Sequence, residues 1–136
     1  AVVLDVSRHA GELDRDALRA AGLDRAPARL LLKTGRSIAG GAFPAGWPAL
    51  NPDCAAALVA DGLRLLGVDC PSVDLRESKA LAVHHALFDG GAFILEHLDL
   101  SQAAEGSYDL IAVPVKLGGL DAAPVRAVLH HSHPGP

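Results

Sequence analysis

Two adjacent histidines are the residues of this chain with the clearest capacity for chemistry. His84 and His85 lie in a segment with helical periodicity, in which Leu81 and Phe88 complete the i, i+3, i+4, i+7 spacing of an apolar face. We therefore expect both imidazoles on or beside that face. Imidazole and carboxylate groups are good ligands for zinc and manganese, so a carboxylate brought close to one of these histidines would form part of a metal site.

Glu96 is the candidate carboxylate, in the strand-like segment that follows. Alternation along a strand would place Glu96 on the same face as Ile94 and Leu98, and His97 on the opposite, surface-facing side. A carboxylate among apolar neighbours must be paired with a cation or neutralised by a raised pKa. A divalent metal shared between His84 and Glu96 meets that requirement.

Other interpretations of these residues stay open. A helix histidine is more often a structural residue than a ligand, and two ligands without a third form a weak metal pattern. Glu96 could instead pair with Lys116 or Arg126. His85 could also be the ligand in place of His84.

The turn that follows another strand-like segment is a second candidate for a site. Asp69 ends that strand and enters a turn that reaches Asp74. Because ligands gather beyond the carboxyl ends of strands in open α/β sheets, this turn could form the rim of a site. The simpler interpretation, which we favour, is that Asp69 or Ser72 caps a turn and that Asp74 is solvated.

A long loop rich in glycine and proline covers residues 34–50. Its length exceeds that of most connections in compact domains, which favours a binding loop or a lid. Phe43 and Trp47 could cover an apolar ligand from this loop. We favour the alternative that they attach the loop to the core.

Strand-like and helix-like segments alternate along the chain, which predicts an α/β fold with a mixed β-sheet and flanking helices. Helices between the early strands imply parallel crossovers, whereas the closely spaced late strands suggest antiparallel or mixed pairing. The second helix begins after the Asn51 cap, with Pro52 at its first position, and Ser78 can cap the third. The expected strands are 1–6, 29–33, 63–69, 92–98, 108–115 and 124–129, and the expected helices are 14–21, 52–61 and 79–89.

The composition restricts the class of protein. A chain of 136 residues allows one domain, and 12 Lys and Arg against 16 Asp and Glu provide no basic stripe for nucleic acid. No apolar stretch approaches the ~20 residues that span a bilayer, so we expect no membrane association. Cys54 and Cys70 form no disulfide framework, which fits a reducing, cytoplasmic setting.

Five sequence blocks in a fixed order identify a family. These blocks are Gly67-Val-Asp-Cys-Pro-Ser-Val-Asp74, Ser78-Lys with Leu81 and His84-His85, Ile94-Leu-Glu96, Gly106-Ser-Tyr-Asp-Leu-Ile-Ala-Val-Pro114, and Ala123-Pro-Val-Arg-Ala-Val-Leu129. The series closely resembles the bacterial kynurenine formamidases, within the cyclase family of metal-dependent hydrolases. The resemblance covers nearly the whole chain, to about Leu129.

The resemblance implies an arylformamidase of tryptophan catabolism, which hydrolyses N-formyl-L-kynurenine to L-kynurenine and formate. It implies the cyclase-like, swivelling β/α type of fold, a homodimer, and zinc or manganese in a site that holds two metals in the full-length enzyme. It assigns His84 and Glu96 as two of the metal ligands.

One segment of the family pattern has no counterpart here. The family takes its other ligands and its catalytic histidine from an upstream H-x-G-T-H-x-D-x-P-x-x-H segment, whereas His9 is the only histidine before His84. We therefore expect residues 1–129 to match the C-terminal part of one cyclase-family domain, followed by a flexible tail over 130–136. No catalytic acid or base is assigned, the substrate-binding residues are unknown, and we expect this chain alone to be inactive.

Two alternatives to a formamidase remain. The chain could be a non-catalytic module that keeps the fold for binding or assembly. It could also belong to a related hydrolase of amides or lactams, similar to isatin hydrolase.

Overall fold

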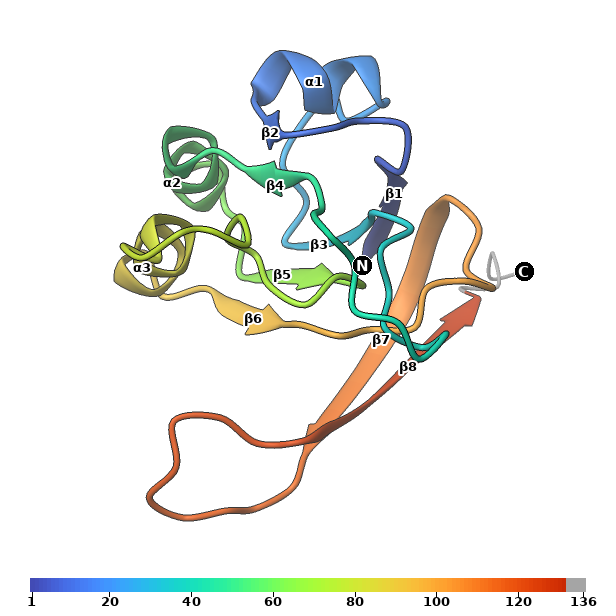
Figure 1. Cartoon of the computed structure of the whole chain (residues 1–136), viewed down its shortest axis with the longest axis vertical. Helices are drawn as coiled ribbons and strands as arrows, with labels where there is room; N and C mark the ends of the chain where they lie inside the picture. The colour runs from blue at the N-terminus through green and yellow to red at the C-terminus, as the bar shows by residue number, and fades with distance from the viewer. Residues whose placement is uncertain (132–136) are drawn as a thin grey trace, which may run out of the picture.

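Short leucine- and valine-rich segments form a six-stranded mixed sheet, in the order β6-β5-β3-β1-β7-β8 (Figure 1). The structure is a computed structural model that describes residues 1–131. Four strands run parallel to one another: β1 (Val2–Asp5), β3 (Arg29–Lys33), β5 (Leu65–Val68) and β6 (Phe93–Leu95). The last two are antiparallel to their neighbours: β7 (Gly106–Pro114) and β8 (Val125–His131). The expected parallel and antiparallel parts of the sheet are therefore confirmed.

The two faces of the sheet bury different sets of side chains. Leu30 and Leu32 of β3 belong to the larger core, whereas Leu31 between them belongs to a second cluster on the opposite face, as the two-residue period of a strand requires. The helices α2 (Pro52–Ala60) and α3 (Ala82–Asp89) cover the face with the larger core (Figure 1). The parallel strands can therefore be apolar on both faces.

A smaller layer lies beyond α2. It contains the helix α1 (Arg15–Ala20) and a two-stranded parallel sheet of β2 (Glu12–Leu13) and β4 (Ala49–Leu50). The strand β4 occupies the end of the loop expected over 34–50. This pairing joins the far end of that loop to the body of the protein.

The second helix begins as its sequence predicts, but the third does not. The Asn51 side chain accepts a hydrogen bond from the Cys54 N–H and caps α2. Ser78 does not cap α3, which begins later than expected, at Ala82. Leu81 precedes it in the left-handed region, with φ 49° and no side-chain cap of its own.

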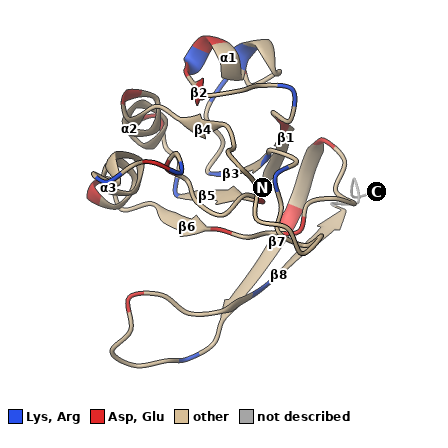
Figure 2. Cartoon of the chain, viewed as in Figure 1, with Lys and Arg blue, Asp and Glu red and all other residues tan. Residues whose placement is uncertain are grey.

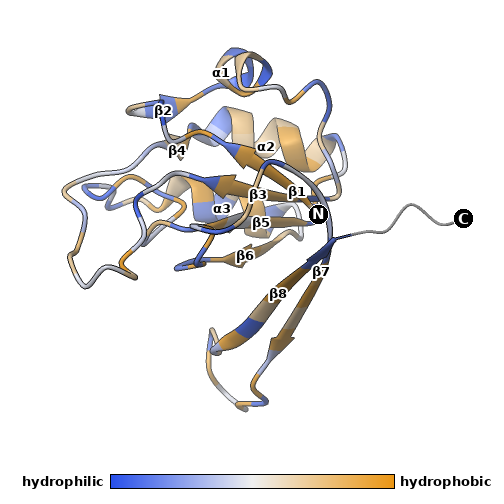
Figure 3. Ribbon diagram, turned by 90° about the vertical axis from the view of Figure 1, so that its right-hand side faces the viewer, coloured by the Kyte–Doolittle hydropathy of each residue, from blue (hydrophilic) through white to orange (hydrophobic). Residues whose placement is uncertain are grey.

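The β7–β8 hairpin extends away from the helices and the parallel strands (Figure 3). Ile111 and Val113 of β7 and Val128 of β8 are large apolar side chains exposed along it. Charged residues are scattered over the helices and loops, whereas the hairpin carries few of them (Figure 2). The strand β8 runs to His131, two residues beyond the boundary expected at Leu129. Residues 132–136 of the expected tail, with His133, lie outside the described residues.

No helix in residues 1–131 combines the length and the apolar character that crossing a membrane requires. Cys54 and Cys70 are both buried and both carry free thiols.

The buried cysteines generate a prediction about chemical reactivity. Burial raises the pKa of Cys70 to about 12, and it also raises the pKa of Cys54. Because the thiolate is the nucleophile, iodoacetamide at pH 8 should leave both thiols intact in the folded protein and alkylate both in denaturant. Mass spectrometry of the two reactions checks this, and rapid alkylation of the native chain would contradict the burial of these residues.

Candidate metal centre

The centre of the site is Asp74, a carboxylate that is only 3 % exposed. It lies in the segment between β5 and α3, where the Ser72 hydroxyl accepts a hydrogen bond from the Asp74 N–H and closes a turn. The expected turn at Ser72 is therefore confirmed. The expectation of a solvated Asp74 is wrong, because its side chain faces α3 and not the solvent.

The Asp74 carboxylate satisfies the free N–H groups at the start of α3. Its Oδ1 accepts from the Val83 N–H at 3.0 Å and its Oδ2 from the His84 N–H at 3.2 Å. Burial opposes the ionisation of Asp74, but the hydrogen bonds from His84 and Val83 outweigh it and hold its pKa below the ordinary value. A distant carboxylate thus does the capping expected of Ser78.

The same carboxylate orients the imidazole of His84. The Nδ1 atom of His84 lies 2.6 Å from Asp74 Oδ2. An ionised carboxylate can only accept hydrogen bonds, so Nδ1 carries a proton and donates a hydrogen bond to Asp74. This hydrogen bond holds the ring in one orientation and so fixes the direction in which Nε2, on the other side of the ring, points. A carboxylate behind a histidine fixes ring and tautomer in many metal sites.

Glu96 meets His84 on that other side. Its Oε1 lies 3.4 Å from His84 Nε2 and also accepts a hydrogen bond from the Val73 N–H at 2.9 Å. The two side chains are 21 % and 27 % exposed, so both are accessible from solvent. In residues 1–131 Glu96 forms no ion pair with Lys116 or Arg126.

The expected reason for this position of Glu96 is wrong, although His84 and Glu96 do meet. The strand β6 ends at Leu95, so strand alternation does not extend to Glu96. At His97 the backbone enters the left-handed region, with φ 58°, and turns the chain. His97 is exposed, as expected. Glu96 is half-buried, and its polar partners are the Val73 N–H and the His84 imidazole.

The helix α3 presents a different face to the core from the one expected. Val83 and Leu87 are its buried side chains, whereas Leu81 and Phe88 are exposed. His85 is also exposed, while His84 faces Glu96. Of the two candidate histidines, the structure brings only His84 to the carboxylate.

Asp69, the other carboxylate of this region, is structural. It is 2 % exposed and accepts hydrogen bonds from the N–H and hydroxyl groups of Thr34 and from the Gly35 N–H. These contacts attach the start of the 34–50 loop to the end of β5. The interpretation that Asp69 caps a turn fits this arrangement.

The aromatic residues of the 34–50 loop have different environments. Trp47 is buried and donates a hydrogen bond from Nε1 to the Asp74 carbonyl at 2.8 Å, so it attaches the loop as expected. Phe43 is 61 % exposed and contacts Trp47 through its edge, with ring centroids 6.0 Å apart. The expectation of attachment is therefore wrong for Phe43.

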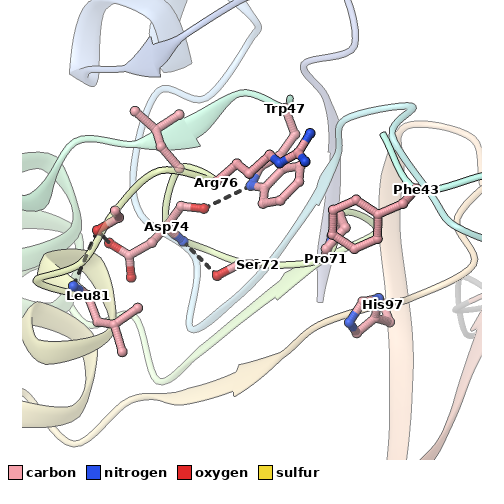
Figure 4. Close-up of a pocket in the computed structure, with 10 residues that line it drawn as sticks. Phe43, Trp47, Pro71, Ser72, Asp74, Arg76, Leu81 and His97 are labelled. Carbon is pink, nitrogen blue, oxygen red and sulfur yellow. Dashed lines mark hydrogen bonds between the residues drawn. The ribbon is translucent and has the colours of Figure 1, made fainter. Parts of the chain in front are cut away.

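A groove of about 330 Å³ lies between this loop and the segment that carries Asp74. Figure 4 shows Trp47 and Phe43 on one side of it, with Asp74, Leu81 and His97 around the rest. Asp74 thus belongs both to the wall of the groove and to the support of His84. No local signal in the sequence indicated this role, because its partners are nine and ten residues away.

Two arrangements can satisfy the contact between His84 Nε2 and Glu96 Oε1. One is a protonated imidazole, which lies between the two carboxylates of Asp74 and Glu96 and offsets one of their two charges. The other is a metal that both atoms bind. At bond lengths of about 2.0–2.1 Å, two donors of a tetrahedral site lie roughly 3.4 Å apart, which equals the observed separation of 3.4 Å. Within residues 1–131, however, no third His, Cys, Asp or Glu joins the pair.

Comparison with known proteins shows where this arrangement belongs. The chain is 41 % identical over 129 residues to a kynurenine formamidase from one strain of Bacillus cereus, and 48 % identical over 101 residues to that from another strain of the same species. These alignments cover 93 % and 74 % of this chain. The chain belongs to the kynurenine formamidase family. It spans 60 % and 48 % of the lengths of these two relatives. No protein-family model matches the chain.

Solved structures confirm the cyclase-like, mixed-sheet fold expected for this family. A predicted metal-dependent hydrolase from Bacillus stearothermophilus superposes with a TM-score of 0.81 and 29 % identity, over 95 % of this chain and 62 % of that one. A potential metal-dependent hydrolase with cyclase activity gives the same TM-score and identity, over 95 % and 63 % of the two chains. An isatin hydrolase bound to thioisatinate superposes at 0.75 and 23 % identity, over 92 % and 56 %, which is evidence of fold alone.

The hydrogen bonds of Asp74 lead to a prediction about stability. Asp74→Asn removes the charged acceptor that holds the start of α3, so the free energy of unfolding should fall by about 2 kcal/mol. Urea denaturation followed by circular dichroism measures this change. The control, Asp24→Asn, alters an exposed carboxylate and should change stability by less than about 0.5 kcal/mol. Equal effects of the two substitutions would contradict the capping role.

Proposed function

We propose that this chain contributes two ligands, His84 and Glu96, to the metal centre of an arylformamidase that hydrolyses N-formyl-L-kynurenine to L-kynurenine and formate. The observation that carries the proposal is the 3.4 Å separation of His84 Nε2 and Glu96 Oε1, with Asp74 behind the imidazole. The kynurenine formamidases of Bacillus cereus, at 41–48 % identity, support the substrate class. The metal-dependent hydrolases among the structural neighbours support the metal.

Each residue of the site has a defined task in this proposal. Asp74 holds the His84 ring and keeps the proton on Nδ1, so that the Nε2 lone pair is available to a metal ion. The Val73 N–H holds Glu96 in position. When bound, zinc or manganese supplies the activation of water and the polarisation of the formyl carbonyl.

The described residues supply only part of such a centre. His84 and Glu96 lack a third ligand within residues 1–131, and none of the described residues is assigned as the catalytic acid or base. The relatives are longer than the part that this chain spans. We propose that the further ligands, the second metal and the acid or base belong to that additional part. The chain alone is then expected to leave N-formyl-L-kynurenine intact.

Metal binding tests the proposal directly. Isothermal titration calorimetry with Zn²⁺ and with Mn²⁺ should show that His84→Ala and Glu96→Gln each weaken binding more than about tenfold, because each removes a ligand. His85→Ala is the matched control, since it removes an exposed imidazole from the adjacent position, and it should bind as the unaltered chain does.

The opposite results would identify the alternatives. Unchanged binding in His84→Ala would exclude the metal centre at this pair. An unaltered chain that binds neither metal would favour the non-catalytic binding or assembly module, with His84 as a protonated partner of two carboxylates. The observation that favours this non-catalytic module is that no third ligand joins His84 and Glu96 within residues 1–131.

We also propose that the protein is a cytoplasmic homodimer that buries the exposed face of the β7–β8 hairpin. Ile111 lies opposite Val128 in the hairpin, and Val113 is the next residue of β7 on the same face. Isolated apolar side chains are normal on a surface, but a contiguous apolar face typically marks an interface. The two free, buried thiols fit a reducing compartment.

Light scattering after size-exclusion chromatography tests the dimer. Ile111→Asp places a charge in the proposed interface and should convert a dimer into a monomer at micromolar concentration. Ala56→Asp, an exposed change on α2, should leave the mass unchanged. A chain that is monomeric without any substitution would exclude the proposed dimer.

A further inference from the structure

The groove beside the candidate metal centre has features of a binding site for an aromatic anion. Phe43, Trp47, Arg76 and His97 line it, together with Asp74. Its volume of about 330 Å³ lies at the lower end of the range for small-molecule pockets and suits one substituted aromatic ring. None of these five residues has a part in the metal binding proposed above, except that Asp74 supports His84.

Arg76 is the residue that gives the groove its charge preference. Its guanidinium lies 5.7 Å from the centroid of the Phe43 ring and donates one hydrogen bond, to the Ala45 carbonyl at 3.2 Å. A guanidinium has five N–H donors in a planar fork that matches a carboxylate. No carboxylate of residues 1–131 forms an ion pair with it. Arg76 is therefore a held but uncompensated cation at an aromatic surface.

The other charged group of the groove does not offset Arg76. The Asp74 carboxylate is buried and already accepts hydrogen bonds from Val83 and from two N–H groups of His84. An anion in the groove would therefore meet the guanidinium of Arg76 without facing an unsatisfied carboxylate.

The aromatic side chains supply the second half of the preference. Trp47 is fixed by its hydrogen bond to the Asp74 carbonyl, and Phe43 packs edge-on against it while most of its own ring stays exposed. An exposed phenyl ring held between an indole and a guanidinium presents an apolar surface next to a positive charge. A planar aromatic ligand with an adjacent carboxylate matches both parts.

We infer that this groove binds the aromatic ring of an anionic aryl formamide, with Arg76 as the receptor for its carboxylate and Phe43 as the apolar contact. The inference rests on the proposed function and makes it more specific, since it assigns Arg76 as the residue that selects aryl formamides with a carboxylate over those without one. Asp74 connects the groove to the metal ligands, because it forms part of the groove wall and holds the His84 ring.

A matched pair of probes tests the inference without any turnover. The probes are 2-formamidobenzoate and formanilide, which share the aryl formamide and differ in the carboxylate. Trp47 is the only tryptophan of the chain, so its fluorescence reports on the groove itself. In the presence of EDTA, the chain should bind 2-formamidobenzoate about tenfold more tightly than formanilide, as expected for a charge-assisted hydrogen bond.

Three substitutions separate the contributions of charge and ring. Arg76→Ala should reduce the affinity for 2-formamidobenzoate to that for formanilide, and Arg76→Lys should give an intermediate value. Phe43→Ala should weaken both probes equally. Arg29→Ala removes an exposed arginine at the start of β3, outside the groove lining, and should change nothing. Circular dichroism confirms that each variant is folded.

The outcomes distinguish this inference from the function on which it rests. Equal affinity for both probes, no binding of either probe, or an unchanged preference in Arg76→Ala would overturn the role of Arg76. If the unaltered chain binds neither Zn²⁺ nor Mn²⁺ but prefers 2-formamidobenzoate to formanilide, the proposed metal centre would be overturned and the role of Arg76 would stand. Because the fluorescence titration contains no metal, the two results are independent.

Discussion

One buried carboxylate holds the candidate site of this protein together. Asp74 carries a charge in a nearly water-free position, and such a charge is tolerated only when donors surround it. The donors come from the start of α3 and from the ring of His84, so the beginning of the helix and the orientation of the imidazole are fixed by the same atoms. Trp47 binds the carbonyl of the same residue and adds the 34–50 loop to this arrangement.

The two buried carboxylates divide the work at this edge of the sheet. Asp69 follows the last residue of β5 and fixes the start of the long loop through Thr34 and Gly35. Asp74, five residues later in the chain, fixes the helix and the histidine. The carboxyl end of a parallel strand thus becomes the edge where loop, helix and groove meet, which agrees with the general position of ligand sites in open α/β sheets.

The candidate metal site has only two ligands among the described residues, and the hairpin has an uncovered apolar face. The pair of His84 and Glu96 has the separation of two metal ligands, yet the described residues add no third one. The β7–β8 hairpin exposes apolar side chains that a stable surface would normally cover. The chain also spans only part of the length of its relatives.

The sequence by itself determined the elements whose signals are local. The leucines of residues 29–33 predicted the strand β3, and Asn51 predicted the start of the helix α2. Both signals are local, because strand period and capping depend on neighbouring residues. The residue types also selected His84 and Glu96 as candidates. Only the tertiary structure decided why they meet, since β6 ends at Leu95 and the strand alternation that the sequence suggested does not reach Glu96. It also decided the role of Asp74, because a buried charge takes its donors from whichever backbone groups the fold brings near it.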